Sequence, residues 1–119
     1  MMKLGIVTHF DAAHSLPGYE GKCKNIHGHT YKVEVTVEGE IDEKTKFVID
    51  YNDLKAIIED LLNKLDHRYL NEILDYPSCE MIVTHIKEEL SKELKSIGLS
   101  IELLSIKLWE GKNKWVMIE

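Results

Sequence analysis

The sequence predicts an α+β domain in which two helices pack on one face of an antiparallel sheet. Three observations lead to this prediction. Apolar and polar residues alternate over 3–14 and 29–39, two amphipathic stripes with helical spacing follow, and two further strand-like segments end the chain. Grouped strands and grouped helices, rather than strict alternation of the two, are typical of such a sheet. A chain of 119 residues has the size of one domain, so residues 1–119 are expected to form a single domain.

The first two strands carry the clearest pattern in the chain. In the segment 3–14, apolar side chains and His14 share one face. In the segment 29–39, His29, a tyrosine and three valines share one face, while threonine, lysine and glutamate occupy the other. One apolar and one polar face indicate antiparallel strands with one solvated side. Residues 15–25, between the two segments, contain one proline and two glycines and are expected to form a loop.

Two helices are expected in the middle of the chain. Apolar residues over 52–65 recur at intervals of three and four, and Asp50 or Asn52 is a candidate N-cap. Ser78 is the candidate N-cap of a second amphipathic helix, which Gly98 is placed to end.

The remaining segments connect or complete these elements. Residues 40–46 are charged and turn-like, and residues 66–77 are expected to form a connector with a short helical turn. After the second helix, 99–110 is expected to be a strand, 111–114 a turn and 115–119 a final strand. The expected order is therefore two strands, two helices and two strands.

Composition and charge exclude several classes of function. Fifteen basic and twenty-one acidic side chains give a net charge of −6, which argues against non-specific binding to nucleic acid. No apolar run approaches the length of a membrane-spanning helix, and the N-terminus lacks the pattern of a signal peptide. Two cysteines cannot form a disulfide framework, so reduced thiols in the cytoplasm are expected.

Three histidines lie on matching faces of the two predicted strands. His27 and His29 are two residues apart and share a face, and His14 ends the apolar face of the first strand. If the two strands are neighbours, the three imidazoles converge at one end of the buried face. Three histidine ligands with an open fourth position are typical of a catalytic zinc site. The alternative is that all three are ordinary histidines at strand ends.

Cys23 lies in the predicted loop between Lys22 and Lys24. Adjacent positive charge favours the thiolate form, so this side chain is a candidate metal ligand, nucleophile or general base. The alternative is an inert loop cysteine. Cys79 follows a predicted helix cap and is interpreted as the less reactive, packing cysteine.

Two further carboxylates and a histidine are candidates. Asp66 and His67 follow the first helix, where a loop could aim both at one cleft; alternatively, Asp66 caps the turn and His67 is a surface residue. Glu110 continues the apolar row of the strand 99–110. A buried carboxylate there suits the paired N–H donors of a guanine-like ring, whereas exposure at the strand end is the alternative.

Six segments resemble the 6-pyruvoyl-tetrahydropterin synthase / 6-carboxytetrahydropterin synthase family, in the order of that family and over essentially the whole chain. They are FDAAHSL (10–16), KCKNIHGHTYKVEV (22–35), FVIDYNDLK (47–55), LDHRYLN (65–71), PSCEMIV (77–83) and LWEG (108–111). The resemblance implies the tunnelling fold, a four-stranded antiparallel sheet with two helices inserted between its hairpins. It also implies a homohexamer, a dimer of trimers, with active sites between subunits.

The resemblance also implies a role for each candidate residue, with Zn2+ as the metal and a pterin triphosphate as the small-molecule substrate. The implied metal ligands are His14, His27 and His29, the implied catalytic residues are Cys23, Asp66 and His67, and the implied anchor of the pterin ring is Glu110. Lys22, Lys24 and Arg68 are further candidates for contacts to the triphosphate.

Spacing in the loop separates the branches of this family. The motif C-x3-H-G-H over 23–29 resembles the 6-carboxytetrahydropterin synthases of the queuosine and archaeosine pathways, whereas biopterin-pathway synthases usually have two more residues before the first histidine. Another branch, which cleaves dihydroneopterin-type side chains, carries a glutamate in this loop, and residues 24–26 contain none.

The resemblance therefore implies conversion of 7,8-dihydroneopterin triphosphate to 6-carboxy-5,6,7,8-tetrahydropterin, acetaldehyde and triphosphate. The alternatives are formation of 6-pyruvoyl-tetrahydropterin by elimination of triphosphate, and a zinc-dependent module that binds a pterin without turnover.

Overall fold

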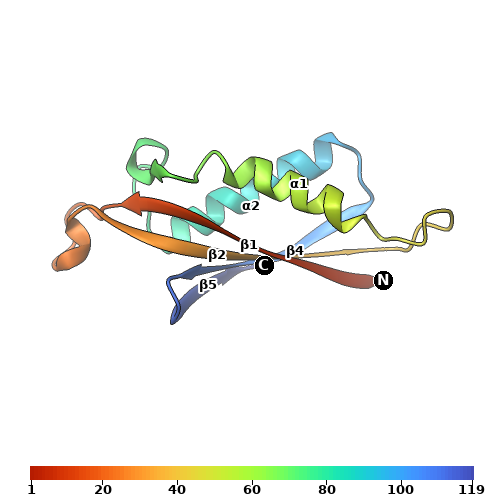
Figure 1. Cartoon of the computed structure of the whole chain (residues 1–119), viewed down its shortest axis with the longest axis horizontal. Helices are drawn as coiled ribbons and strands as arrows, with labels where there is room; N and C mark the ends of the chain where they lie inside the picture. Colours follow the sequence, from red (N-terminus) through yellow and green to blue (C-terminus); the bar gives the residue numbers. More distant parts are fainter.

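The computed structural model describes residues 1–119 and confirms the α+β class, with two helices on one face of a sheet (Figure 1). Its elements are β1 (Met2–His14), the 3-10 helix η1 (Lys22–Lys24), β2 (His27–Gly39), α1 (Tyr51–Leu62), β3 (Arg68–Tyr69), the 3-10 helix η2 (Leu70–Glu72), α2 (Cys79–Ser96), β4 (Ile101–Glu110) and β5 (Lys114–Ile118). The two helices lie between the β1–β2 and β4–β5 hairpins in the chain, as the sequence predicts.

The sheet has five strands in the order β3-β1-β2-β4-β5. The neighbours among β1, β2, β4 and β5 are antiparallel, as predicted, whereas β3 pairs in parallel with Ala12 and Ala13 of β1. The predicted sheet has four strands, so β3 is an addition. It forms because the turn after α1 returns along the edge of β1, where the His67 N–H donates to the carbonyl of Asp11 at 2.6 Å.

The alternation in β2 explains which face of the sheet is covered. Val33 and Val35 have no exposed surface, whereas Lys32 and Glu34 are partly exposed on the opposite face. The buried apolar side chains of the strands pack against those of α1 and α2 in one cluster. The core therefore lies between the sheet and the helices, and the other face of the sheet carries no helix (Figure 1).

Both helices begin at the residues that the sequence indicates. Asp50 caps α1 by accepting the N–H of Asn52 at 2.8 Å, and Ser78 caps α2 in the same way at 3.2 Å. The first helix ends at Leu62, three residues before the predicted end, because the N–H of Leu65 donates to the carbonyl of Leu62 and tightens the chain into a turn.

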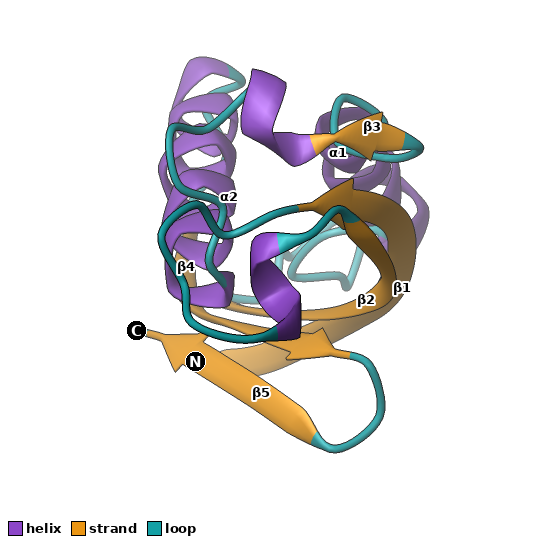
Figure 2. Cartoon of the chain, turned by 90° about the vertical axis from the view of Figure 1, so that its left-hand side faces the viewer, coloured by secondary structure: helices purple, strands orange, loops and turns teal.

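The molecule is elongated, with dimensions of 55 × 26 × 19 Å, and the candidate residues gather toward one end. At this end β1 finishes and β2 begins, with η1 between them and the turn of β3 and η2 close by (Figure 2). Within the predicted loop, η1 is folded back on β1 because the Leu16 N–H donates to the carbonyl of Cys23 at 2.8 Å. Neither α1 nor α2 has the length and apolar character needed to cross a bilayer.

Candidate active site

Three histidines converge where β1 ends and β2 begins. His14 and His27 are paired directly across the two strands, and His29 lies opposite Ala12. The ligand nitrogens of the three rings all lie within 4.8 Å of one another, and their ring centroids are 4.5, 4.8 and 5.2 Å apart. Pairing of the two strands thus brings together three imidazoles that are fifteen positions apart at most in the sequence.

Main-chain carbonyls fix the orientation of two of these rings. The Nδ1 of His14 lies 2.7 Å from the carbonyl oxygen of Pro77, and the Nδ1 of His27 lies 2.8 Å from that of Asn25. Because a carbonyl oxygen only accepts, each Nδ1 carries the hydrogen and each Nε2 is left with a lone pair. The two Nε2 atoms are 3.0 Å apart, so two lone pairs face each other and a cation between them would relieve the repulsion.

The third ring, that of His29, presents an unpartnered nitrogen. Its Nε2 is buried and makes no hydrogen bond, although the Oε1 of Glu110 lies 3.5 Å away. Burial lowers the pKa of His29, with Glu110 opposing this effect. The ring is therefore held as a neutral imidazole, which is the form that binds metal.

The three imidazoles form a donor set that fits a divalent transition metal. Two rings have carbonyl partners of the kind that orient metal-bound histidines, and the third has a buried nitrogen without a hydrogen bond. Three histidine ligands leave a coordination position open to a substrate oxygen, as in catalytic zinc sites. His14, His27 and His29 are thus the residues that could hold a metal ion.

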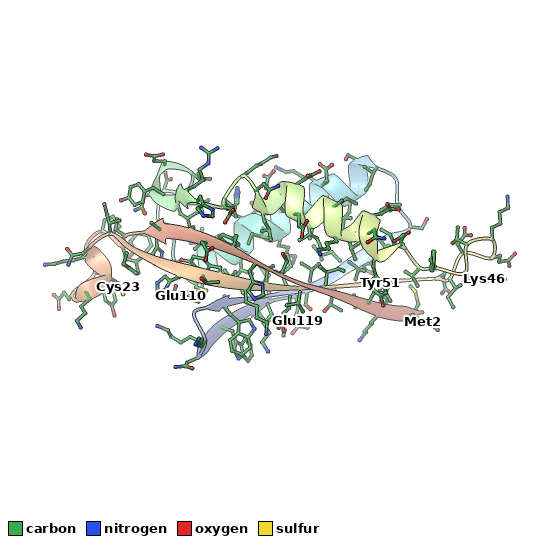
Figure 3. The ribbon with its side chains drawn as sticks, viewed as in Figure 1. Met2, Cys23, Lys46, Tyr51, Glu110 and Glu119 are labelled. Atoms are coloured by element: carbon green, nitrogen blue, oxygen red, sulfur yellow. The ribbon has the colours of Figure 1, made fainter.

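A pocket of about 550 Å³ joins η1, α2 and the β4–β5 hairpin. Cys23 lines it from η1, Cys79 from the first turn of α2, and Glu110 from the end of β4. Figure 3 shows Cys23 and Glu110 toward the same end of the molecule. Lys22 and Lys24, which flank Cys23 in the sequence, do not line this pocket.

Glu110 connects this pocket to the histidines. Its side chain is 17% exposed, and its Oε1 lies 3.5 Å from the Nε2 of His29 and 3.8 Å from the Nζ of Lys114. Of the two alternatives that the sequence leaves open, the structure has the covered and paired carboxylate. Such a carboxylate can accept two parallel N–H donors from a planar ring in the pocket.

The two cysteines of the pocket differ in their surroundings. Burial raises the pKa of the Cys79 thiol to about 12, and the charges of Glu110 and Glu80 add to this effect. The Cys79 sulfur also lies 3.8 Å from the carbonyl oxygen of Leu108, to which its S–H can donate. Cys79 is therefore a protonated, packed thiol, and Cys23 is the other thiol that lines the pocket.

Asp66 and His67 form a hydrogen-bonded pair in the turn between α1 and β3. The Nδ1 of His67 donates to the Oδ2 of Asp66 at 2.8 Å, and the N–H of Asp11 donates to the other carboxylate oxygen at 2.9 Å. The Asp11 N–H, followed by His67, lowers the pKa of Asp66, and the hydrogen bond to Asp66 raises the pKa of His67. The His67 side chain is 78% exposed, on a backbone with a φ of 57°. Contacts within the chain therefore fix the orientation of the pair, while the His67 ring is exposed to solvent.

The Asp66–His67 pair faces a different depression of the surface from the one that Cys23 lines. We call this depression the His67 hollow; it has a volume of about 610 Å³, and its lining includes Asp11, His67 and Arg68 but not Cys23. A single chain therefore separates the candidate catalytic residues into two groups.

The main-chain groups that orient the candidate residues leave no signal in the sequence. The carbonyls of Pro77 and Asn25 and the N–H of Asp11 are main-chain groups, so side-chain identity gives no signal for them. Lys114 did leave a signal, because the short turn of the β4–β5 hairpin pairs it directly with Glu110.

Comparison with protein families gives a match over nearly the whole chain. The description of 6-pyruvoyl tetrahydropterin synthase matches residues 3–119. A relative from Archaeoglobus fulgidus, to which the name 6-carboxy-5,6,7,8-tetrahydropterin synthase is provisionally given, is 39% identical and covers 98% of this chain and 95% of its own. A 6-carboxy-5,6,7,8-tetrahydropterin synthase from Synechocystis is 40% identical over 80% of this chain and 79% of its own.

A relative with a different name is equally similar. The dihydroneopterin monophosphate aldolase of Pyrococcus furiosus is 40% identical, covering 92% of this chain and 90% of its own. Among solved structures, the 6-pyruvoyl tetrahydropterin synthase of Caenorhabditis elegans superposes with a TM-score of 0.85 at 24% identity, covering 99% of this chain and 94% of its own. This structural likeness establishes that the chain has the tunnelling fold.

Proposed function

This chain belongs to the 6-pyruvoyl tetrahydropterin synthase family, and from this we propose that it converts 7,8-dihydroneopterin triphosphate and one molecule of water to 6-carboxy-5,6,7,8-tetrahydropterin, acetaldehyde and triphosphate. The chain is a pterin synthase, an enzyme of the lyase type. The observation that carries the proposal is the convergence of His14, His27 and His29 beside the pocket that Cys23 and Glu110 line.

The pocket offers a binding mode for the pterin ring. Glu110 is covered and pairs with Lys114, so its carboxylate is suited to accept the ring N–H and amino donors of a pterin. The Oε1 of Glu110 lies 3.5 Å from the Nε2 of His29, so a pterin ring held by Glu110 would have its side chain close to the metal site. We assign Glu110 as the residue that anchors and orients the substrate.

The reaction then needs a proton acceptor and a proton donor. The Cys23 thiolate would remove a proton from a carbon of the pterin side chain, and His67, held by Asp66, would move protons at the side-chain oxygens. When bound, Zn2+ supplies Lewis-acid stabilisation to the hydroxyl and carbonyl oxygens of the substrate. His14, His27 and His29 would hold this ion with their neutral rings.

The separation of Cys23 from His67 within one chain supports an active site between subunits. We propose a homohexamer, a dimer of trimers, in which the Asp66–His67 pair of one subunit closes the Cys23 pocket of its neighbour. The sheet has suitable edges for such an assembly. One edge is β5, and the other is the part of β1 that the two-residue β3 leaves unpaired.

We propose that this activity belongs to 7-deazapurine biosynthesis, the queuosine or archaeosine pathway, and takes place in the cytoplasm. The motif C-x3-H-G-H over 23–29 favours this branch over the biopterin branch. Two free cysteines suit a reducing compartment.

Incubation of the purified protein with 7,8-dihydroneopterin triphosphate, followed by mass analysis of the pterin and an assay for acetaldehyde, tests the proposal. We expect 6-carboxy-5,6,7,8-tetrahydropterin and acetaldehyde in equal amounts. Formation of 6-pyruvoyl-tetrahydropterin without acetaldehyde would contradict the proposal and indicate elimination of triphosphate alone. Stoichiometric binding of the pterin without any product would indicate a binding module instead.

The second candidate is cleavage of the side chain of dihydroneopterin monophosphate. It is favoured by the 40% identity to the Pyrococcus furiosus aldolase over 92% of this chain. The absence of a glutamate from residues 24–26 argues against this branch. Parallel incubation with the monophosphate separates the two candidates, because turnover of the monophosphate with release of a two-carbon aldehyde other than acetaldehyde would favour the aldolase.

A further inference from the structure

The uncovered face of the sheet carries a second depression, which the proposed function does not use. We call it the Lys32 hollow; it has a volume of about 660 Å³ and lies over β1, β2 and the end of β4. Its lining includes the basic side chains of His9, Lys32 and Lys112 together with Trp109, and it contains no carboxylate. In a chain with a net charge of −6, this local concentration of basic groups favours an anionic ligand.

Most of the basic side chains in the Lys32 hollow are not engaged in ion pairs. The Nζ of Lys32 lies 5.2 Å from the centre of the Trp109 ring, and the indole N–H donates to Glu34 at 3.2 Å, which fixes the ring. Glu34 also pairs with Lys32 at 3.7 Å, whereas neither Lys112 nor His9 takes part in an ion pair. At least two of the three basic side chains are therefore free to bind an anion.

The Lys32 hollow is continuous with the His67 hollow. Gly28, His29 and Thr30 of β2 line both, so this stretch of strand forms a common floor. A Cβ added at Gly28 would lie 3.6 Å from the nearest atom, the Ala12 carbonyl oxygen, which is an ordinary contact. Neither packing nor backbone conformation requires glycine here. Because glycine has no side chain, no side chain at position 28 separates the two hollows.

We propose that the Lys32 hollow binds the triphosphate tail of the substrate, with Lys32, Lys112 and His9 as its partners. This inference rests on the proposed function, in which the reacting side chain of the pterin comes within reach of His67. From that point the tail can extend over the bare floor at Gly28 into the Lys32 hollow of the subunit that supplies His67. Lysine side chains provide mobile point charges that suit a flexible polyphosphate.

The position of the other basic candidates supports the same assignment. Lys22 and Lys24, which lie in η1 between the end of β1 and the start of β2, line neither hollow. Arg68 lines the His67 hollow, from which the tail would enter. The alternative is that the triphosphate contacts Lys22 and Lys24. A variant that removes these two charges is therefore a charge-matched control.

The test is calorimetric titration of the metal-loaded protein with inorganic triphosphate. We expect the double variant Lys32→Gln/Lys112→Gln to bind triphosphate roughly ten- to a hundredfold more weakly than the unmodified protein, since it loses two charge-assisted contacts. The double variant Lys22→Gln/Lys24→Gln, with the same change of charge, should stay within about twofold. Circular dichroism checks that both variants keep the fold.

Equal affinity of the two variants, or a larger loss in Lys22→Gln/Lys24→Gln, would overturn the assignment. Where turnover is measurable, the Lys32→Gln/Lys112→Gln variant should show a raised KM for the triphosphate substrate with kcat nearly unchanged, and an unchanged KM would likewise contradict the proposal. If triphosphate binds through Lys32 and Lys112 but no 6-carboxytetrahydropterin is formed, the anion site stands and the proposed reaction fails.

Discussion

Cys23 and Cys79 line one pocket but lie in different surroundings. Cys79 is kept protonated by burial, with a pKa of about 12, and Cys23 lies in the exposed turn η1. We therefore expect Cys23→Ala to bind a dihydropterin within about twofold of the unmodified affinity but to lose at least about a hundredfold in turnover, the size of a general-base contribution. Fluorescence titration and product assays measure the two quantities.

Cys79→Ala is the matched control for this variant and should keep its turnover within about threefold, because its thiol only packs and takes no part in proton transfer. Turnover above about a tenth of the unmodified rate in Cys23→Ala would show that this thiol is not the base.

The Asp66–His67 pair makes a prediction about proton binding. The hydrogen bond to Asp66 raises the pKa of His67, so the imidazole keeps its proton to a higher pH than a free histidine would. Asp66→Asn removes the carboxylate, and the pKa of His67 should fall toward the ordinary value of about 6.5. Titration of the ring protons by NMR measures this shift directly.

An unchanged His67 titration in Asp66→Asn would mean that the carboxylate does not hold the imidazolium, and the proposed proton shuttle would lose its orienting group.

The candidate site residues are easier to predict from the sequence than the main-chain groups that orient them. The alternation that placed His29 with the valines of β2 also placed it beside His14, because strand pairing follows the same faces. The carbonyl of Pro77, which orients His14, lies 63 positions away in the sequence, and no side chain marks it. A pattern in one sequence identifies side chains that share a face, and it cannot identify a main-chain group that the fold brings from elsewhere.

At the scale of elements, α2 stabilises the fold through its buried face. Ile86 has no exposed surface, whereas Met81, one turn and a half earlier on the same helix, is 50% exposed. Ile86→Ala should lower the free energy of unfolding by about 3 kcal/mol, because it removes buried methylenes and leaves a cavity. Met81→Ala should cost less than about 1 kcal/mol. Urea denaturation of both variants measures the difference, and equal costs would contradict the described packing.

The proposed metal site links two elements and so predicts an effect on stability as well as on turnover. An ion held by His14, His27 and His29 would join the end of β1 to the start of β2, and a ligand that binds only the folded chain raises the unfolding temperature. Chelation should therefore lower Tm by several degrees, and added Zn2+ should restore it.

The variant His29→Ala should lose this dependence on metal, whereas His85→Ala should keep it, because His85 lies on α2 outside the cluster. Equal Tm values with and without Zn2+ in the unmodified chain would argue against a metal at the three histidines.

The elements differ in how far the sequence predicts them. The long alternation of β2 and the apolar stripes of α1 and α2 are local properties of the chain, and each appears close to its expected place. The two residues of β3 carry no pattern of their own, because they form a strand only through pairing with Ala12 and Ala13. The turn η1 likewise depends on the contact between Leu16 and Cys23. Elements defined by a distant partner are the ones that sequence patterns do not show.

On the scale of the whole molecule, one chain presents the candidate groups in two separate places. Cys23 and Glu110 line one pocket, while His67 lies exposed in a different hollow. His67, the proposed proton shuttle, is 78% exposed and would need a second surface to enclose it. The edges of β1 and β5 have unpaired main-chain groups, with which strands of other copies could pair. These observations favour an active site that two subunits share, and this arrangement can be tested in solution.

The test is complementation between two inactive variants. Cys23→Ala lacks the proposed base and His67→Ala lacks the proposed shuttle, so each should be inactive alone. If each site takes Cys23 from one subunit and His67 from its neighbour, reassembly of an equal mixture should restore about one quarter of the sites, since the two intact halves meet with that probability. As a control, mixing Cys23→Ala with His27→Ala should restore nothing, because both residues belong to the same half of the site. Recovery in neither mixture, with reassembly verified by native mass spectrometry, would place Cys23 and His67 of a single chain in one site and overturn the shared arrangement.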